Sequence, residues 1–328
     1  MGEFDLIERY FRQPVRRAAL GVGDDCALLR VTPGHQLAVS SDMLVQGRHF
    51  LEGTDPHALG HKALAVNLSD LAACGAQPLA FTLALALPAA DPRWLEPFAH
   101  GLLALAHAHD CELVGGDTTA GPLNICITVF GEIPAGNGRS QALLRSGARD
   151  GDDIYVSGTL GDARLALEAM RGQWPSLPAA LHAQALQRLH RPTPRVALGQ
   201  ALRGVAHAAI DVSDGLLGDL GHVLQASGVG AELQMPAAPG QLMACGAAAL
   251  DVCVPPRHQL ACVLAGGDDY ELAFTAAPGQ RDAVQAAAHA SATPVTRIGR
   301  IVSGSGVRVL DAHGAPVSDN WRSFDHFG

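Results

Sequence analysis

IDVSDGLLGDLGHVLQASG, residues 210–228, passes from an apolar run through a short polar turn into a helical pattern. The turn holds two aspartates, Asp211 and Asp214, with Ser213 between them and Gly215 just after them. Aspartate is a poor residue inside a helix and a good one at its start, so either aspartate can serve as an N-cap. A cap explains one carboxylate and leaves the second to be explained.

Length and composition limit the class of protein. A chain of 328 residues is long for one domain and sufficient for two, each with its own core. The net charge of −9 argues against nucleic acid or an anionic membrane surface as the main partner. The acidic N-terminus is unlike a signal peptide, and the longest apolar run, residues 78–88, is about half of a membrane span. We therefore expect a cytoplasmic protein with neither a nucleic-acid nor a membrane partner.

Cysteine and lysine usage exclude several kinds of site. The seven cysteines are scattered and contain no CxxC pair, which favours buried free thiols in a reducing compartment over a disulfide frame or a zinc site. The single lysine, Lys62, opens a helical pattern and follows no GxxxxGK[ST] loop. Neither a P-loop nor the strand lysine of protein kinases is present, so any nucleotide must be held in another way.

Periodicity predicts two α+β domains, each a mixed α/β sandwich, in preference to one doubly wound sheet. The Gly-, Pro-, Asn- and Ser-containing segment 134–141 is the best linker candidate, which gives domains at 1–137 and 138–328. The expected strands are 37–42, 78–88, 111–116, 124–134, 153–158, 206–211, 270–276, 295–302 and 306–311, and the expected helices are 57–75, 91–109, 162–172, 194–203 and the one after Gly215.

Aspartates recur where a strand or helix gives way to small residues. Taken singly, each Gly-Asp or Ser-Asp pair is more typical of a turn or an N-cap than of a ligand. Asp70 differs, because it lies inside a helical pattern with Asn67 on the same face and apolar neighbours around it. The recurring places are GVGDDCALL (Asp24, Asp25), AVSSDMLV (Asp42), LVGGDTTAG (Asp117), AIDVSDG (Asp211, Asp214) and LAGGDDYEL (Asp268, Asp269).

Together these carboxylates indicate divalent cations. Crowded carboxylates repel each other unless cations lie between them, and Mg²⁺ prefers one or two carboxylates completed by phosphate oxygens and water. The glycines of VGGDTTAG and AGGDD also let backbone amides approach phosphate oxygens. Asp211 and Asp214 would then be metal ligands, with Ser213 turned toward a nucleotide.

The ordered set of motifs resembles the thiamine-monophosphate kinase family over essentially the whole chain. GVGDD and NLSDLAA also fit the wider superfamily of aminoimidazole ribonucleotide and selenophosphate synthetases. The C-terminal motif WRSFDHF favours the thiamine-monophosphate kinase branch of that superfamily. The matching stretches are GVGDDCALL (21–29), SSDMLVQGRHF (40–50), KALAVNLSDLAACGAQP (62–78), LVGGDTT (113–119), LLRSGARDGDDIYVSGTLGD (143–162), HRPTPRVALGQALR (190–203), AIDVSDGLLGDLGH (209–222), GGDDYELAFT (266–275) and WRSFDHF (321–327).

This resemblance implies transfer of the γ-phosphoryl group of ATP to thiamine monophosphate by a homodimer whose N-terminal domains pair through their sheets, with ATP near that interface. It implies several Mg²⁺ ions held by Asp25, Ser40, Ser41, Asp42, Asp70, Asp117, Asp211 and Asp214. By the same resemblance Gly116, Asp117, Arg145 and Ser213 contact ATP, and His49, Asp268 and Phe324 contact the thiamine substrate. Asp268 replaces the glutamate usual in the family and is one methylene shorter.

The chemistry requires no general base, and we assign none. Phosphoryl transfer depends mainly on alignment and charge neutralisation. A phosphate acceptor has a second pKa of about 6 and is largely dianionic near neutrality. Two alternatives remain open: an ATP-dependent synthetase of the aminoimidazole ribonucleotide or selenophosphate type, and a non-catalytic nucleotide-binding maturation factor.

Overall fold

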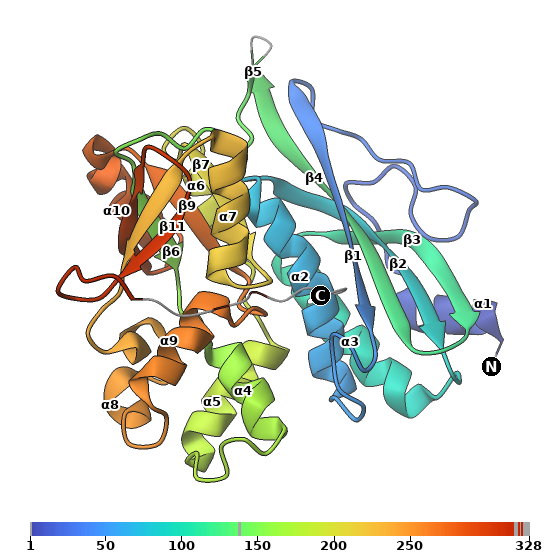
Figure 1. Cartoon of the computed structure of the whole chain (residues 1–328). Helices are drawn as coiled ribbons and strands as arrows, with labels where there is room; N and C mark the ends of the chain where they lie inside the picture. The colour runs from blue at the N-terminus through green and yellow to red at the C-terminus, as the bar shows by residue number, and fades with distance from the viewer. Residues whose placement is uncertain (1, 137–138, 318–320, 322, 324–328) are drawn as a thin grey trace. The chain divides into compact units, whose positions relative to one another are not determined.

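The computed structural model describes residues 2–136, 139–317, 321 and 323, and it divides into two compact units (Figure 1). The first unit contains residues 1–71 and 76–141, and the second contains residues 72–75 and 142–328. Each unit combines helices with a mixed sheet, which confirms the predicted α+β class. No helix in the described part of the chain is both long and apolar enough to cross a bilayer.

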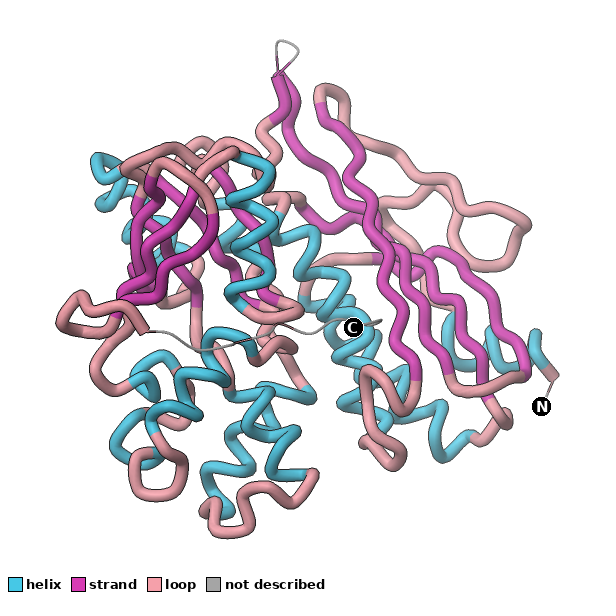
Figure 2. Tube along the Cα trace, viewed as in Figure 1, coloured by secondary structure: helices cyan, strands magenta, loops and turns pink. Residues whose placement is uncertain are grey.

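The sheet of the first unit has the order β1-β4-β2-β3, and the short β5 pairs with β4 (Figure 2). β4 is antiparallel to both β1 and β2, whereas β2 and β3 are parallel and joined through α3. The elements of this unit are β1 (His35–Val45), α2 (Pro56–Ala73), β2 (Gln77–Leu87), α3 (Pro92–Ala108), β3 (Glu112–Ala120), β4 (Asn124–Gly136) and β5 (Arg139–Ser140), preceded by α1 (Glu3–Leu6) and a short helix at Ile7–Phe11.

Two glycines let α2 and α3 cross at very short range. A Cβ on Gly60 would lie 2.1 Å from the carbonyl oxygen of Phe98, and one on Gly101 would lie 1.9 Å from the carbonyl oxygen of His57. No side chain fits at either position, so the backbones of the two helices touch. This contact fixes the position of α2 against α3. The same helix carries Asn67 and Asp70.

The two faces of the first sheet differ in exposure. Ile125, Ile127 and Val129 alternate along β4 and are buried. The opposite face carries the side chains of Leu37, Val39 and Met43 on β1, which are 45%, 56% and 51% exposed. A row of exposed apolar side chains on an edge strand is unusual for a surface that faces water in the functional state.

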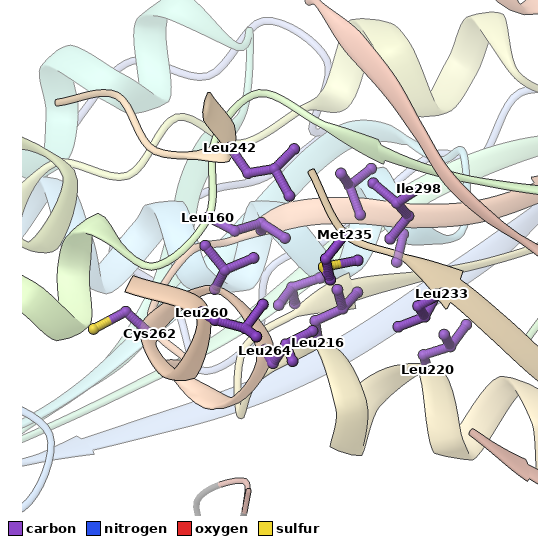
Figure 3. Packing of buried hydrophobic residues seen from close by; sticks show 14 of the residues in the cluster. Leu160, Leu216, Leu220, Leu233, Met235, Leu242, Leu260, Cys262, Leu264 and Ile298 are labelled. Carbon is purple, nitrogen blue, oxygen red and sulfur yellow. The ribbon is translucent and has the colours of Figure 1, made fainter. Parts of the chain in front are cut away.

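The second unit contains a six-stranded sheet in the order β11-β8-β10-β6-β9-β7; among its described strands, only β11 and β8 are parallel neighbours. Its core joins the sheet to the surrounding helices, with Leu160, Leu216, Leu220 and Leu233 among the buried residues (Figure 3). The elements are β6 (Asp153–Ser157), α4 (Asp162–Met170), α5 (Ala179–His190), α6 (Val196–Ala201), β7 (Ala208–Val212), α7 (Leu216–Ser227), β8 (Gly230–Gln234), α8 (Ala247–Leu250), α9 (Pro256–Ala265), β9 (Glu271–Ala276), α10 (Arg281–Ala290), β10 (Val295–Val302) and β11 (Gly306–Leu310).

Several local expectations are corrected by the structure. The linker predicted at 134–141 is in part a strand pair, because β4 continues to Gly136 and Arg139–Ser140 pairs back onto it. Asp42 and Asp117 lie inside β1 and β3 and not at strand ends, because both strands continue past the small residues. All seven cysteines are free as expected, but only three of them are buried: Cys26 is exposed in the loop before β1, and Cys74, Cys126 and Cys253 are partly buried.

Candidate phosphoryl-transfer site

The helix-facing side of β1 holds two of the predicted ligands, Ser40 and Asp42, against α2, which carries a third, Asp70. The hydroxyl of Ser40 donates to Oδ2 of Asp70 at 2.5 Å, and the backbone N–H of Asp42 donates to Oδ1 of Asn67 at 3.1 Å. The amide of Asn67 in turn donates to the carbonyl of Ala63 at 3.0 Å, which fixes which end of that side chain meets β1. Ser40, Asp42 and Asp70 therefore form one group of candidate oxygen ligands.

Ser41 and Asp117 belong to the other face of the same sheet. The hydroxyl of Ser41 lies 3.0 Å from the hydroxyl of Thr128 and donates to the carbonyl of Ile127 at 3.1 Å. Asp117 is exposed and lies opposite Ala84 of β2. Because neighbours in register share a face and successive residues alternate, these two side chains are on the side away from Ser40 and Asp42.

Two further predicted residues of the first unit lie in loops. Asp25 is exposed, and its backbone N–H donates to Oδ1 of Asp24 at 2.9 Å. His49 follows β1 in a turn, where its Nδ1 accepts from the backbone N–H of Val45 at 3.0 Å.

In the second unit, Asp219 fixes the loop that carries Asp214, whereas Asp211 lies just before this loop, inside β7. Its Oδ2 accepts from the backbone N–H groups of Ser213, Asp214 and Gly215 at 3.0, 3.0 and 3.1 Å. Burial raises the pKa of Asp219 to about 7, and the charge of Asp214 adds to this, while the three amide donors act in the opposite direction. Sequence analysis missed Asp219, although an aspartate in the first turn of a helix after a polar loop is a known capping signal.

The turn before β9 brings Asp268 to the same loop. The backbone N–H of Asp268 donates to the carbonyl of Ser213 at 2.8 Å, and that of Tyr270 donates to the carbonyl of Val212 at 2.8 Å. Both residues have positive φ, 61° and 52°, a conformation that costs free energy outside glycine and is typical of functional turns. Ser213, Asp214 and Asp268, with Asp211 near the end of β7, thus form a second group of candidate site residues.

The acidic residues beside Asp268 have a different role. Both oxygens of Asp269 accept from the N–H of Gly161, at 2.9 and 3.0 Å, and complete burial raises the pKa of this carboxyl well above its ordinary value. Glu271 is fully buried and binds Arg188 at 2.6 Å and Arg195 through two hydrogen bonds of 2.6 Å. This ion cluster, Glu271 with its two arginines, is linked to the turn by Arg188, which donates to the carbonyl of Asp269 at 3.3 Å. Sequence analysis did not find the cluster.

Three of the predicted site residues belong to neither of these two groups. Gly116 has φ 144°, and a Cβ there would lie 1.8 Å from the carbonyl oxygen of Leu83, so only glycine fits beside β2. Arg145 is exposed, while its carbonyl accepts a hydrogen bond from the hydroxyl of Ser227 at 3.2 Å. Phe324 lies outside the described residues.

The two ligand groups suit a hard divalent cation. Every side chain in them offers oxygen, which Mg²⁺ prefers, and neither thiol nor imidazole is included. Within the described residues, the predicted aspartates do not form a set of three with ligand atoms mutually within 4.8 Å; Glu168, His258 and Cys262 do. This is consistent with Mg²⁺, which takes one or two carboxylates and obtains its remaining ligands from phosphate and water.

Comparisons with known proteins agree with the fold. Residues 23–133 match the family model of the AIR synthase related protein, N-terminal domain, and residues 149–312 match that of the C-terminal domain. A thiamine-monophosphate kinase of Salmonella typhimurium is 46% identical over 330 residues, covering 99% of this chain and 98% of the relative.

Two solved structures extend the comparison. The thiamine-monophosphate kinase from Stenotrophomonas maltophilia K279a has 47% identity and a TM-score of 0.81, with 92% of each chain covered. AaThiL complexed with AMPPCP and TMP has 30% identity and a TM-score of 0.75, covering 91% of this chain and 89% of that one.

Proposed function

We propose, on the premise that this chain belongs to the thiamine-monophosphate kinase family of AIR synthase related proteins, that it phosphorylates thiamine monophosphate with ATP to give thiamine diphosphate and ADP. The observation that carries the proposal is 46% identity to a thiamine-monophosphate kinase across 99% of the chain. The related structure with AMPPCP and TMP supports the same pair of substrates.

Mg²⁺, when bound, supplies neutralisation of the two phosphate groups and of the charge that spreads over the transferred phosphoryl. Its proposed ligands are Asp25, Ser40, Ser41, Asp42, Asp70, Asp117, Asp211 and Asp214. The protein's own part is to hold these oxygens in place: Ser40 and Asn67 orient the first group, and Asp219 orients the second. No side chain has to remove a proton, because the acceptor phosphate is already dianionic near neutrality.

Substrate contacts are proposed for the residues that the family motifs supply. Gly116, Asp117, Arg145 and Ser213 would bind ATP; the forked guanidinium of Arg145 suits phosphate, and its exposure leaves it accessible. His49, Asp268 and Phe324 would bind thiamine monophosphate, with the ring of Phe324 against the cationic thiazolium. We propose that residues 1–137 form the domain that binds ATP and magnesium and dimerises. Residues 138–328 would complete the nucleotide and substrate site.

A product assay tests the reaction. Protein incubated with ATP, MgCl₂ and thiamine monophosphate should form thiamine diphosphate, whereas free thiamine should give no product because it offers an alcohol and not a phosphate. Chromatography of the thiamine phosphates measures both. Absence of product over a range of magnesium concentrations would reject the proposal.

The alternatives predict different results. A selenophosphate-type synthetase usually has a reactive cysteine or selenocysteine before the first acidic motif, and here no cysteine precedes Cys26. An aminoimidazole ribonucleotide-type synthetase would consume ATP with an amide acceptor and not with thiamine monophosphate. A maturation factor would bind ATP in calorimetry without turnover on any of these acceptors.

We propose that the chain forms a homodimer through the open face of the first sheet. The exposed side chains of Leu37, Val39 and Met43 support this, since pairing two copies would remove them from water. Val39→Lys should convert the dimer to a monomer in analytical ultracentrifugation. Val252→Lys is the matched control, because Val252 is 88% exposed in the second unit and should tolerate the charge. A dimer that persists in Val39→Lys would place the interface elsewhere.

A further inference from the structure

We propose that Glu168, His258 and Cys262 form a binding site for Zn²⁺, separate from the magnesium ligands and contained within the second unit. Their ligand atoms, a carboxylate oxygen, an imidazole nitrogen and a thiol sulfur, all lie within 4.8 Å of one another. No other group of three such side chains meets that distance among the residues that the structure describes.

Two helices supply the three ligands. His258 and Cys262 are four residues apart on α9, so both side chains leave the same face of that helix. Glu168 comes from the last turn of α4 and meets them from the opposite side. In Figure 3 the sulfur of Cys262 lies at the margin of the apolar cluster and is directed away from Leu260 and Leu264. The thiol therefore lies at the edge of the core cluster to which Cys262 belongs, within 4.8 Å of the ligand atoms of Glu168 and His258.

The donor set is the one that zinc uses. Zn²⁺ binds cysteine sulfur, histidine nitrogen and carboxylate oxygen in tetrahedral sites, often with water as a fourth ligand. Magnesium and calcium avoid thiolate and imidazole, so this site and the aspartate groups would select different metals. Nε2 of His258 and Oε2 of Glu168 are now 2.6 Å apart and hydrogen-bonded. They must separate to about 3.4 Å around an ion with bonds of about 2.1 Å.

Binding the ion requires only a small separation of His258 from Glu168, and His258, the more exposed ligand, can make this movement. The side chain of His258 is 32% exposed, whereas that of Glu168 is 4% exposed and Cys262 is 1% exposed. His258 can swing outward, and the same opening admits the ion from solvent. The buried pair then forms the floor of the site.

Neighbouring side chains hold Glu168 in place. Nε of Arg164 donates to Oε1 at 2.7 Å, Nε1 of Trp174 donates to Oε2 at 3.1 Å, and the rings of Trp174 and His258 are 4.7 Å apart. Such outer partners orient metal ligands and tune their basicity. Oε1 keeps its bond to Arg164 while Oε2 turns to the ion.

Burial, and next to it the charge of Glu168, raises the pKa of the Cys262 thiol, so without metal the sulfur carries its proton at neutral pH. Zinc binding therefore releases that proton, and the ion's two positive charges balance the thiolate and the carboxylate. The expectation of free thiols without zinc rested on the absence of CxxC pairs. The present site takes its ligands from two different helices, and Glu168 and His258 are 90 residues apart in the sequence.

The test uses the full-length protein without a polyhistidine tag, freed of metal by chelation and dialysis. Titration with Co²⁺ should produce a thiolate-to-cobalt charge-transfer band that saturates at one ion per chain and disappears when Zn²⁺ is added. Cys262→Ser should abolish the band, and both Cys262→Ser and His258→Gln should weaken Zn²⁺ binding by about 100-fold or more, since losing even an outer partner costs about 10- to 100-fold.

Cys245→Ser is the matched control, because Cys245 is also buried in the second unit but lies outside this cluster. It should keep both the band and the affinity. His258→Gln changes a partly exposed residue and keeps the outcome readable if Cys262→Ser does not fold. No charge-transfer band in the native protein, or equal Zn²⁺ affinity in the native protein and in folded His258→Gln, overturns the proposal.

Discussion

Asp70→Asn should lower kcat/KM for thiamine monophosphate by about 100- to 1000-fold, the loss typical when one preorganised charge-stabilising group is removed. The fold should survive, because asparagine has the same shape and its Oδ1 can still accept the hydrogen bond from Ser40. What disappears is the negative charge that would hold Mg²⁺. Steady-state kinetics and circular dichroism measure the two effects.

Asp91→Asn provides the control for that experiment. Asp91 caps the N-terminus of α3 by accepting from the backbone N–H of Arg93 at 2.9 Å, and asparagine caps equally well. Its rate and stability should match those of the native protein. Asp211→Asn should behave like Asp70→Asn. Near-native turnover in either Asp70→Asn or Asp211→Asn would contradict the metal assignment.

Glu271→Ala should destabilise the second unit by about 3–5 kcal/mol, because it leaves two arginines without their buried partner. Arg188 and Arg195 both bind Glu271 at 2.6 Å, and their side chains are only 13% and 15% exposed. The hydroxyl of Ser157 also loses its acceptor, to which it now donates at 2.5 Å. Urea denaturation followed by circular dichroism measures the change.

Glu232→Ala is the control for Glu271→Ala, because it also removes a glutamate that binds two arginines, but these arginines are exposed. Glu232 also binds two arginines, Arg300 and Arg308, whose side chains are 65% and 68% exposed. Water can solvate both guanidinium groups after the substitution, so the loss of stability should be far smaller. Equal losses in the two variants would show that burial of the Glu271 ion cluster is not what makes it stabilising.

The strand and helix pattern of the chain could be predicted wherever apolar residues are periodic. The strands 78–88 and 124–134 coincide closely with β2 and β4, and the helix expected at 91–109 is α3. β8, at Gly230–Gln234, was missed because it is short, begins with glycine and follows directly on α7. Its strand conformation comes from pairing with β10 and β11, and local sequence does not record such pairing.

The candidate ligand residues were easier to predict from the sequence than the residues that hold them in place. Small-residue turns draw attention to Asp211 and Asp214, but Asp219 looks like an ordinary helical aspartate until its three amide contacts are seen. In GGDDYE the acidic residues look equivalent, whereas Asp268 faces the loop at Ser213 and Asp269 binds Gly161 inside the unit. Side-chain direction at such a turn depends on the positive φ of Asp268, which composition does not reveal.

The side chains of β1 point alternately to the two faces of the sheet, and this restricts which insertions and deletions the strand can accept. Leu37, Val39 and Met43 point to one side, and Ser40 and Asp42 to the other. Deleting a single codon within the strand would exchange the two sides, turning carboxylate and hydroxyl outward and apolar side chains toward α2. A point substitution there affects one side of the strand, whereas a one-codon length change would disrupt the proposed magnesium ligands and the proposed association surface in the same event.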